Sequence, residues 1–221
     1  MPEEQYRALT RYLVPVDMSA GMRLSEPNRP IESVYFPVSG MISIHSLTER
    51  GESVEVGIIG REGISGISGL LGHLHMPHSA VVQGAGSALR IRVGVLRDEF
   101  LKGGALAQAV HSTIYLQMVQ MSQGVLCGRL HAVDVRMARW MLTAADWMES
   151  ESITITQESL GQMLGSRRST VTVAAGDLQR KGLIEYSRGK IRIVDRAGLE
   201  AMACECYHVV RTAYQTLMGR S

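Results

Sequence analysis

Residues 154–182 constrain the fold of this chain most, because they predict two short capped helices joined by a tight turn. The Thr156 hydroxyl can cap the first helix, and Gly165 can adopt the left-handed conformation that ends it. Ser166 is expected to cap the second helix. An apolar face on the first helix is formed by Leu160, Met163 and Leu164. The pattern is typical of a helix-turn-helix, although an ordinary surface helical hairpin shares it.

The second helix divides its residues between two faces. One face is predicted to be buried and consists of Val171, Ala174, Ala175 and Leu178. The opposite face is small and mostly polar and consists of Ser169, Thr172, Val173, Gly176 and Arg180. Arg167 and Arg168 lie in the first turn, where the helix dipole disfavours positive charge. Binding of a phosphate group or of a guanine base edge at this helix end would explain why both arginines are present.

Residues 183–187 and 190–194 are two short alternating runs joined around Arg188-Gly189, which predicts a β-hairpin, or wing. Residues 165–192 hold seven basic and two acidic side chains, a local net charge of +5. Residues 1–149 hold 13 basic and 14 acidic ones, so the formal net charge of +2 hides a basic C-terminal part. This asymmetry favours a nucleic-acid partner.

The N-terminal part has a different residue composition and a different spacing of apolar residues. Residues 3–13 predict a short helix, and residues 22–97 are rich in Gly, Val, Ile and Ser in short runs spaced as in an all-β barrel or roll. A loop between these runs carries four glycines, Gly63, Gly66, Gly69 and Gly72. The glycines either allow a ligand to approach the backbone or only turn corners of the roll.

A long helix is predicted from about residue 96 to 123. Its apolar seam includes Val110, Ile114, Met118, Met121 and Val125. The seam either packs on the roll or pairs with a second copy of the chain, and the pairing of DNA-reading modules favours a homodimer. Residues 130–142 predict a further amphipathic helix that packs behind the helix-turn-helix.

Several functional classes are not expected. No run approaches the roughly 20 apolar residues that cross a bilayer, and no signal segment is evident, so a cytoplasmic protein without a membrane partner is predicted. Catalytic motifs such as a Walker loop or a nucleophile elbow are missing, so the chain is not expected to be an enzyme. Cys127, Cys204 and Cys206 are interpreted as structural thiols, because a Cys-x-Cys spacing is too close for a typical zinc site.

The order of β-roll, long helix, packing helix, helix-turn-helix and wing resembles the Crp/Fnr family of bacterial transcription regulators. The resemblance lies in residues 34–40 and 55–63 of the roll and, more specifically, in residues 155–184. In family members with known DNA contacts, an Arg, a Glu and a second Arg reach base edges, and the corresponding positions here are Arg168, Ser169 and Val173. Only the first Arg is kept, so the operator is expected to differ from that of the cyclic-AMP receptor.

The resemblance implies a set of DNA-binding residues and two partners. The residues are Thr156, Gln157, Arg167, Arg168, Ser169, Thr170, Thr172, Val173, Arg188 and Lys190. The partners are double-stranded DNA, bound by a homodimer at an inverted repeat, and RNA polymerase.

The ligand-binding side departs from the family pattern. Cyclic-nucleotide-binding members hold the ribose with a Glu and the cyclic phosphate with an Arg, whereas this chain has Gly66-Ile67-Ser68-Gly69-Leu70 and His78-Ser79-Ala80. The possible effector loop is therefore Gly66, Ser68, Gly69, His78 and Ser79, and cyclic AMP is not expected to bind. No cofactor is predicted. A small-molecule receptor, or a haem or metal sensor using His73, His75 and His78, is the alternative.

The predicted architecture is α+β: a jelly-roll-like, cyclic-nucleotide-binding-like sensor roll in residues 1–103, a dimerisation helix in 104–128, and a winged helix-turn-helix with a C-terminal helix in 129–221. The predicted function is sequence-specific transcription regulation.

Overall fold

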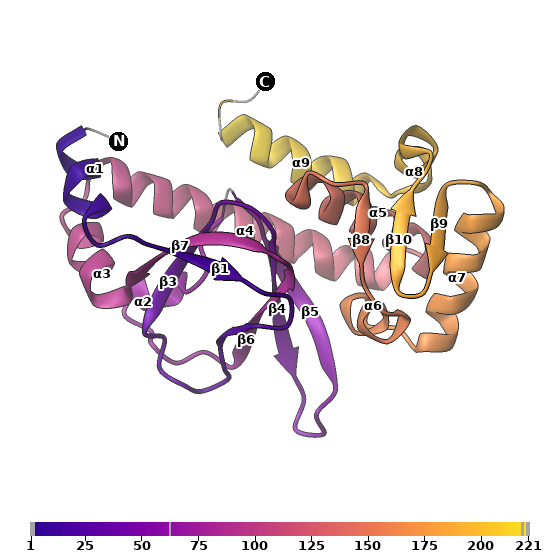
Figure 1. Cartoon of the computed structure of the whole chain (residues 1–221), viewed down its shortest axis with the longest axis horizontal. Coiled ribbons are helices and arrows are strands. Elements are labelled where there is room, and N and C mark those ends of the chain that lie inside the picture. Colours follow the sequence, from indigo (N-terminus) through magenta and orange to yellow (C-terminus); the bar gives the residue numbers. More distant parts are fainter. Residues whose placement is uncertain (1–2, 62, 218, 220–221) are drawn as a thin grey trace. The chain divides into compact units, whose positions relative to one another are not determined.

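The computed structural model describes residues 3–61, 63–217 and 219. The chain divides into two compact units (Figure 1): residues 1–47 with 58–117, and residues 48–57 with 118–221. No helix in the described part of the chain is long and apolar enough to cross a membrane.

The first unit is a two-sheet roll, as predicted. The strands of the roll are β1 (Val14–Met18), β2 (Arg23–Ser25), β3 (Ser33–Pro37), β4 (Met41–Leu47), β5 (Ser53–Ile59), β6 (His78–Gly84) and β7 (Gly86–Arg92), of which residues 53–57 in β5 are grouped with the second unit. One sheet has the order β1-β7-β3 and the other β2-β6-β4-β5. The leading helix α1 (Glu3–Thr10) is shorter than expected, and the roll begins at Val14 rather than near Met22.

Apolar side chains fill both sides of the β1-β7-β3 sheet. Between the two sheets lies a core of Met18, Tyr35, Ile42, Ile59, Ala80, Val82 and Ala88. On the other side, helices pack against the sheet and form a second core with it, which consists of Leu9, Val34, Ile64, Leu70, Ile91, Leu96, Leu106 and Val110. The β3 neighbours Val34 and Tyr35 thus enter different cores, because successive side chains of a strand point to opposite faces.

The glycines of the loop after β5 are explained by packing. A Cβ on Gly63 would lie 2.6 Å from Cγ2 of Ile59, and one on Gly69 would lie 2.5 Å from Cγ2 of Val93. Gly66, at φ +89°, would bring a Cβ within 2.8 Å of the Ser33 carbonyl oxygen. The chain itself therefore occupies the space beside these glycines, which favours the structural interpretation at these positions.

Two helices, not one, follow the roll. Helix α3 (Val93–Leu101) ends before α4 (Gly104–Leu130), and the single helix expected over residues 96–123 is therefore wrong. The break occurs at Gly103, which has φ +79°, a left-handed conformation that glycine adopts readily. Helix α4 contributes residues up to 117 to the first unit and those from 118 to the second.

The apolar seam predicted on α4 is not continuously exposed. Val110 is fully buried in the helical core of the first unit, and Ile114 packs against that core. The expectation that these two belong to an exposed dimer stripe is wrong, because the helix uses this part of its surface to cover its own roll. Met118 and Val125 are 62% and 69% exposed, whereas Met121 is half-buried.

The second unit is a winged helix-turn-helix, as predicted (Figure 1). Its elements are α5 (Val133–Met148), β8 (Ser152–Thr154), α6 (Gln157–Leu164), α7 (Arg168–Arg180), β9 (Ile184–Ser187), β10 (Lys190–Ile193), α8 (Arg196–Met202) and α9 (Glu205–Leu217). Strand β8 was not among the predicted elements, and it extends the wing into an antiparallel sheet of order β8-β10-β9. Helix α5 begins and ends later than the predicted residues 130–142, and it packs against α6 and α7 with Met137, Trp140 and Met141 fully buried, which confirms the packing helix.

Arg196 connects α8 to the rest of this unit. Its guanidinium contacts Asp146 on α5 at 2.5 Å, Glu151 before β8 at 3.1 Å and Glu200 on α8 at 3.0 Å. Burial opposes the charged form, but the hydrogen bond to Asp146 and the charge of that carboxylate raise the pKa of Arg196 above its ordinary value. The Tyr207 hydroxyl also donates a hydrogen bond to Asp146, at 2.8 Å, and this contact brings α9 into the same network.

Candidate nucleic-acid interface

The first helix of the helix-turn-helix, α6, has the predicted caps. The Thr156 hydroxyl accepts a hydrogen bond from the Ser159 amide at 3.0 Å, which satisfies one of the free donors of the helix N-terminus. Gly165 ends the helix in the left-handed conformation at φ 56°. Gly161 allows the turn to fold back closely, because a Cβ there would lie 2.8 Å from the Ser166 carbonyl oxygen.

The prediction that Ser166 caps the second helix, α7, is wrong. The helix begins one residue later than expected, so Arg167 is its N-cap residue, and no side chain caps the first turn. The Ser166 hydroxyl instead accepts a hydrogen bond from the guanidinium of Arg136 at 2.8 Å and donates one to the Leu164 carbonyl oxygen at 3.2 Å. The N-terminus of α7 thus keeps backbone donors that an anion can use.

The two faces of α7 are as predicted. The buried side consists of Val171, Ala174, Ala175 and Leu178. The exposed side includes Arg167, Arg168, Ser169, Thr170, Thr172, Val173 and Gly176. Val173 is a large apolar residue that is 65% exposed, so its methyl groups lie on the outer face of α7.

Hydrogen bonds join the exposed face of α7 to the start of α6. The Thr172 hydroxyl lies 2.8 Å from Oε1 of Gln157 and 2.9 Å from the Arg168 carbonyl oxygen. These contacts fix the Gln157 side chain beside the outer face of α7, so residues predicted from both helices contribute to one surface.

The wing tip lies beside the same end of α6. The Ile155 amide, next to Thr156, donates a hydrogen bond to the Gly189 carbonyl oxygen at 2.8 Å. Tyr186 of β9 donates its hydroxyl to the Ile155 carbonyl oxygen at 2.9 Å. Burial raises the pKa of Tyr186, and the nearby positive charge of Arg168 opposes that shift. The first turn of α7, the start of α6 and the wing therefore form a continuous surface.

The wing turn is the predicted hairpin. Arg188 and Gly189 both have positive φ, 49° and 75°, which is the pattern of a two-residue type I′ turn. An arginine in the left-handed conformation is uncommon, and here it places an exposed guanidinium at the tip. Lys190 pairs with Ser187 across the turn and is also exposed.

Ion pairing divides the basic residues of this module into two sets. Arg180 pairs with Asp177, and Arg192 pairs with Glu185 at 2.7 Å. Within the described part of the chain, no acidic side chain forms an ion pair with any of four exposed residues: Arg167, Arg168, Arg188 and Lys190. Lys181, at the other end of α7, is also exposed and contacts the sulfur atom of Met202 at 3.7 Å. Of the five basic residues in 165–192 without an ion pair among the described residues, four therefore lie at the start of α7 and at the wing tip.

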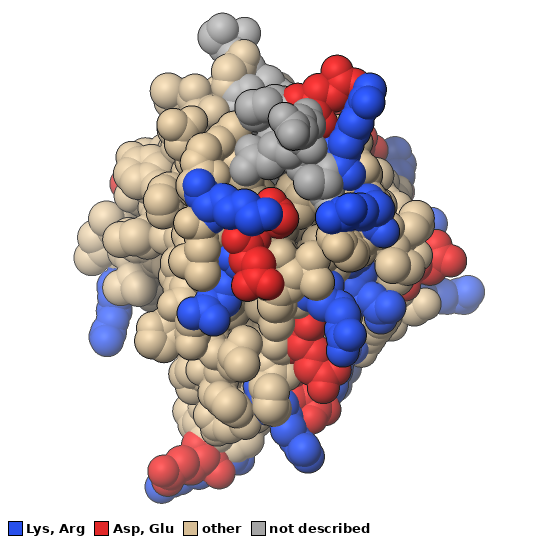
Figure 2. Space-filling model, turned by 90° about the vertical axis from the view of Figure 1, so that its left-hand side faces the viewer, with Lys and Arg blue, Asp and Glu red and all other residues tan. Residues whose placement is uncertain are grey.

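Charges on the N-terminal unit are distributed differently. Figure 2 shows the side that carries α1 and α3, where acidic and basic side chains are interspersed among uncharged residues. This agrees with the nearly even charge count of this unit, whose residues 1–47 and 58–117 hold nine basic and eight acidic side chains. No large field of a single sign is present on this side.

The predicted effector residues lie at two places in the roll. Gly66 precedes the short helix α2 (Ile67–Leu70), which contains Ser68 and Gly69. His78 and Ser79 begin β6, and Ser79 is buried. The loop residues His73 and His75 are exposed, and the described residues 63–217 do not gather them with His78 into a metal-binding group.

Two domain families match the chain. The cyclic nucleotide-binding domain matches residues 15–102, and the Crp-like helix-turn-helix domain matches residues 135–202. The chain belongs to the Crp/Fnr family. This Crp/Fnr protein is thus a transcription regulator built from a cyclic-nucleotide-binding-type roll and a helix-turn-helix domain.

Solved structures share the fold at low sequence identity. A protein from Eubacterium rectale assigned to the Crp/Fnr family is 18% identical, with 91% of this chain and 94% of that chain covered and a TM-score of 0.73. The c-di-GMP-responsive global regulator CLP of Xanthomonas campestris is 13% identical, with 86% and 98% covered and a TM-score of 0.71. FixK2 of Bradyrhizobium japonicum is 14% identical, with 87% and 98% covered and a TM-score of 0.67. No curated protein matches this chain in sequence.

Proposed function

We propose that this Crp/Fnr regulator binds double-stranded DNA at an inverted repeat as a homodimer. The observation that carries the proposal is the surface made by the first turn of α7, the start of α6 and the wing tip. Its four unpaired basic side chains flank the part of α7 where Ser169, Thr172, Val173 and Gly176 present small, uncharged side chains. Phosphates would contact Arg167, Arg188 and Lys190, and base edges would contact Arg168 and the uncharged residues of α7.

The proposed roles follow from the positions of the side chains. Arg168 would read a guanine edge, with Ser169 tolerating several bases and Val173 contacting a thymine methyl group. The phosphate-contacting residues would be Thr156, Arg167, Thr170, Arg188 and Lys190. Gln157 and Thr172 already bond to each other, so they would present a fixed pair of polar groups to the DNA.

A homodimer would place two copies of this surface on one duplex. The exposed part of α4 carries Tyr115, Met118 and Val125 at helical spacing, with exposures of 55%, 62% and 69%. An apolar stripe of this kind is typical of a surface that a partner covers. A second copy of α4 is the proposed occupant. RNA polymerase as a further partner stays a prediction.

Selection of bound sequences from random double-stranded DNA tests the proposed function. We expect an inverted repeat whose half-sites are centred about 34 Å apart, or a multiple of that distance, because a two-fold dimer presents two α7 helices. A matched selection with the Arg168→Ala/Lys190→Ala variant controls for enrichment that does not depend on this surface. Enrichment of a single unrepeated site, or of no sequence, would contradict the proposal.

Cyclic AMP is expected neither to bind nor to change DNA affinity at millimolar concentration. The roll has no carboxylate in residues 66–70 to hold a ribose hydroxyl, and His78 stands where the family places an arginine for the cyclic phosphate. Calorimetry of the full chain with cyclic AMP checks this. A parallel titration with c-di-GMP, to which the Xanthomonas relative responds, tests another nucleotide. A micromolar dissociation constant for cyclic AMP would show that His78, Ser79 and backbone amides suffice.

A further inference from the structure

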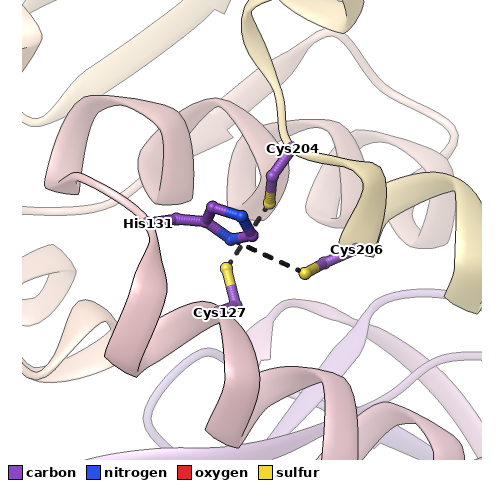
Figure 3. A group of neighbouring side chains, drawn as sticks. All are labelled: Cys127, His131, Cys204 and Cys206. Carbon is purple, nitrogen blue, oxygen red and sulfur yellow. Dashed lines mark hydrogen bonds between the residues drawn. The ribbon is translucent and has the colours of Figure 1, made fainter.

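Three cysteines and one histidine of the second unit, far apart in sequence, meet at one point. The ligand atoms of Cys127, His131, Cys204 and Cys206 all lie within 4.8 Å of one another (Figure 3). The sulfur atoms of Cys127 and Cys204 are 3.5 Å apart, and Nδ1 of His131 lies 3.7 Å from the Cys206 sulfur. In residues 3–61 and 63–217, this is the one such cluster of three or more potential metal ligands.

Local geometry brings each pair of ligands to the same side. Cys127 and His131 are four residues apart at the end of α4, where the His131 amide still bonds to the Cys127 carbonyl oxygen at 3.1 Å. One turn of helix therefore separates them. Cys204 lies in the junction between α8 and α9, and Cys206 lies in the first turn of α9. The chain changes direction at this junction, so a Cys-x-Cys spacing that looked too short can present both sulfur atoms to one point.

We propose that Cys127, His131, Cys204 and Cys206 bind a single Zn²⁺ ion. A tetrahedral zinc ion with bonds of about 2.3 Å to sulfur and about 2.0 Å to nitrogen has ligand-to-ligand edges of roughly 3.5–3.8 Å. The sulfur–sulfur distance of 3.5 Å and the nitrogen–sulfur distance of 3.7 Å have this size, and the remaining pairs, which lie within 4.8 Å, would close onto the ion. A cluster of several irons would hold its cysteine ligands on different metal atoms, and a group this compact suits one ion.

The environment of His131 is a second, independent reason for the assignment. Its Nδ1 faces the sulfur atoms, and its Nε2 lies 3.5 Å from a carboxylate oxygen of Glu205. Histidines that bind metals commonly donate a hydrogen bond from their other ring N–H to a carboxylate, which fixes the ring orientation and the tautomer. Buried thiols that only fill space need neither an imidazole nitrogen among them nor a carboxylate behind it.

The cysteines are enclosed, which distinguishes the site from a surface thiol cluster. Cys127 and Cys206 are fully buried and Cys204 is 6% exposed, with Val135 packed against them. Three protein thiolates and an imidazole would complete a four-coordinate shell and leave no position for a substrate, so the ion would be structural. It would fasten the end of α4 to the junction of α8 and α9. This inference does not depend on the proposed DNA binding.

Metal analysis of the full chain tests the site directly. The protein is purified under reducing conditions, dialysed against metal-free buffer, and measured by plasma mass spectrometry. About one zinc per chain is expected. A metal content near zero that zinc addition does not restore, or one iron or copper per chain instead, would overturn the assignment.

Cobalt substitution reports the ligands themselves. The wild-type protein, freed of zinc by a chelator and given Co²⁺, is expected to show strong visible absorption bands and a near-ultraviolet thiolate-to-cobalt transition, both typical of tetrahedral sulfur ligation. A spectrum of pale octahedral cobalt would overturn the proposal. Alkylation and mass measurement of the same sample test the rival pairing, since a Cys127–Cys204 disulfide that forms in place of metal binding would also overturn it.

Variants separate ligands from neighbours. Cys127→Ser and Cys206→Ser are expected to lose stoichiometric zinc, whereas His208→Ala, an exposed residue on the same helix α9, should keep it. Glu205→Gln leaves all four ligands in place and should weaken zinc binding about 10–100-fold. Because Glu205 is 69% exposed, this variant should fold even if a cysteine variant does not. Unchanged zinc affinity in the Cys206→Ser and Glu205→Gln proteins would contradict the inferred site.

Discussion

Arg168→Ala is expected to weaken operator binding by about 1–3 kcal/mol and to relax the base preference at one position of each half-site. Arg168 is the first residue of α7, is exposed, and forms no ion pair with the described residues that surround it. A bidentate guanidinium contact to guanine discriminates among bases. The loss of affinity in Arg168→Ala should therefore be largest on the selected operator and small on operator variants that already lack that guanine. Binding to single-base operator variants measures this difference.

Lys190→Ala is the matched control for a basic residue of the same surface. Lys190 lies on the wing, where a contact with phosphate carries no sequence information. Its loss should weaken all sequences alike and reduce the slope of log affinity against log salt by about one unit. If Arg168→Ala changed only the salt slope and kept every base preference, sequence would have to be read elsewhere on α7.

The helix-turn-helix and wing were predictable because their signals are local. Thr156 and Gly165 define the ends of α6 through their own backbone and side-chain chemistry, and both act as predicted. The four buried residues of α7 recur at helical spacing, so one face could be assigned without knowledge of the partner elements. The dipeptide Arg188-Gly189 likewise indicates the hairpin turn without reference to any other part of the chain.

Two kinds of prediction were less successful: those that needed the exact first residue of a helix, and those that depended on which surface a helix packs against. Ser166 was assigned as a cap because the start of α7 was placed one residue too early, and a helix boundary is the least certain part of a sequence pattern. Val110 and Ile114 share the spacing of Met118, yet they cover the roll. Periodicity identifies an apolar side of a helix but does not say which surface it meets.

The Cys127, His131, Cys204 and Cys206 group could not be found from cysteine spacing. Seventy-seven residues separate the two cysteines whose sulfur atoms lie 3.5 Å apart, so only the packing of α4 against the junction of α8 and α9 brings them together. The available sequence signal was weak: a Cys and a His at i and i+4 near the end of a predicted helix. His73, His75 and His78 form a stronger sequence pattern because they are close in sequence.

The combination Met118→Asp with Val125→Asp is expected to convert the proposed dimer into monomers at micromolar concentration. Both side chains are more than 60% exposed on α4, so each can be replaced without disturbing the core of its own chain. In a dimer that pairs the two α4 helices, the four introduced carboxylates would lose hydration and repel one another. Ile114→Asp is unsuitable, since Ile114 packs on the core of the first unit and its replacement would destabilise the fold.

Sedimentation velocity of the double variant measures the result, with Leu101→Asp as the control. Leu101 is 65% exposed at the end of α3, so this change introduces the same chemistry outside the proposed interface and should leave the dimer intact. Because a monomer engages only one half-site, operator affinity should also fall by a factor of about 10²–10⁴ through loss of the effective concentration of the second α7. A double variant that still sediments as a dimer would place the interface away from the exposed stripe of α4, and α4 would then serve only packing within the chain.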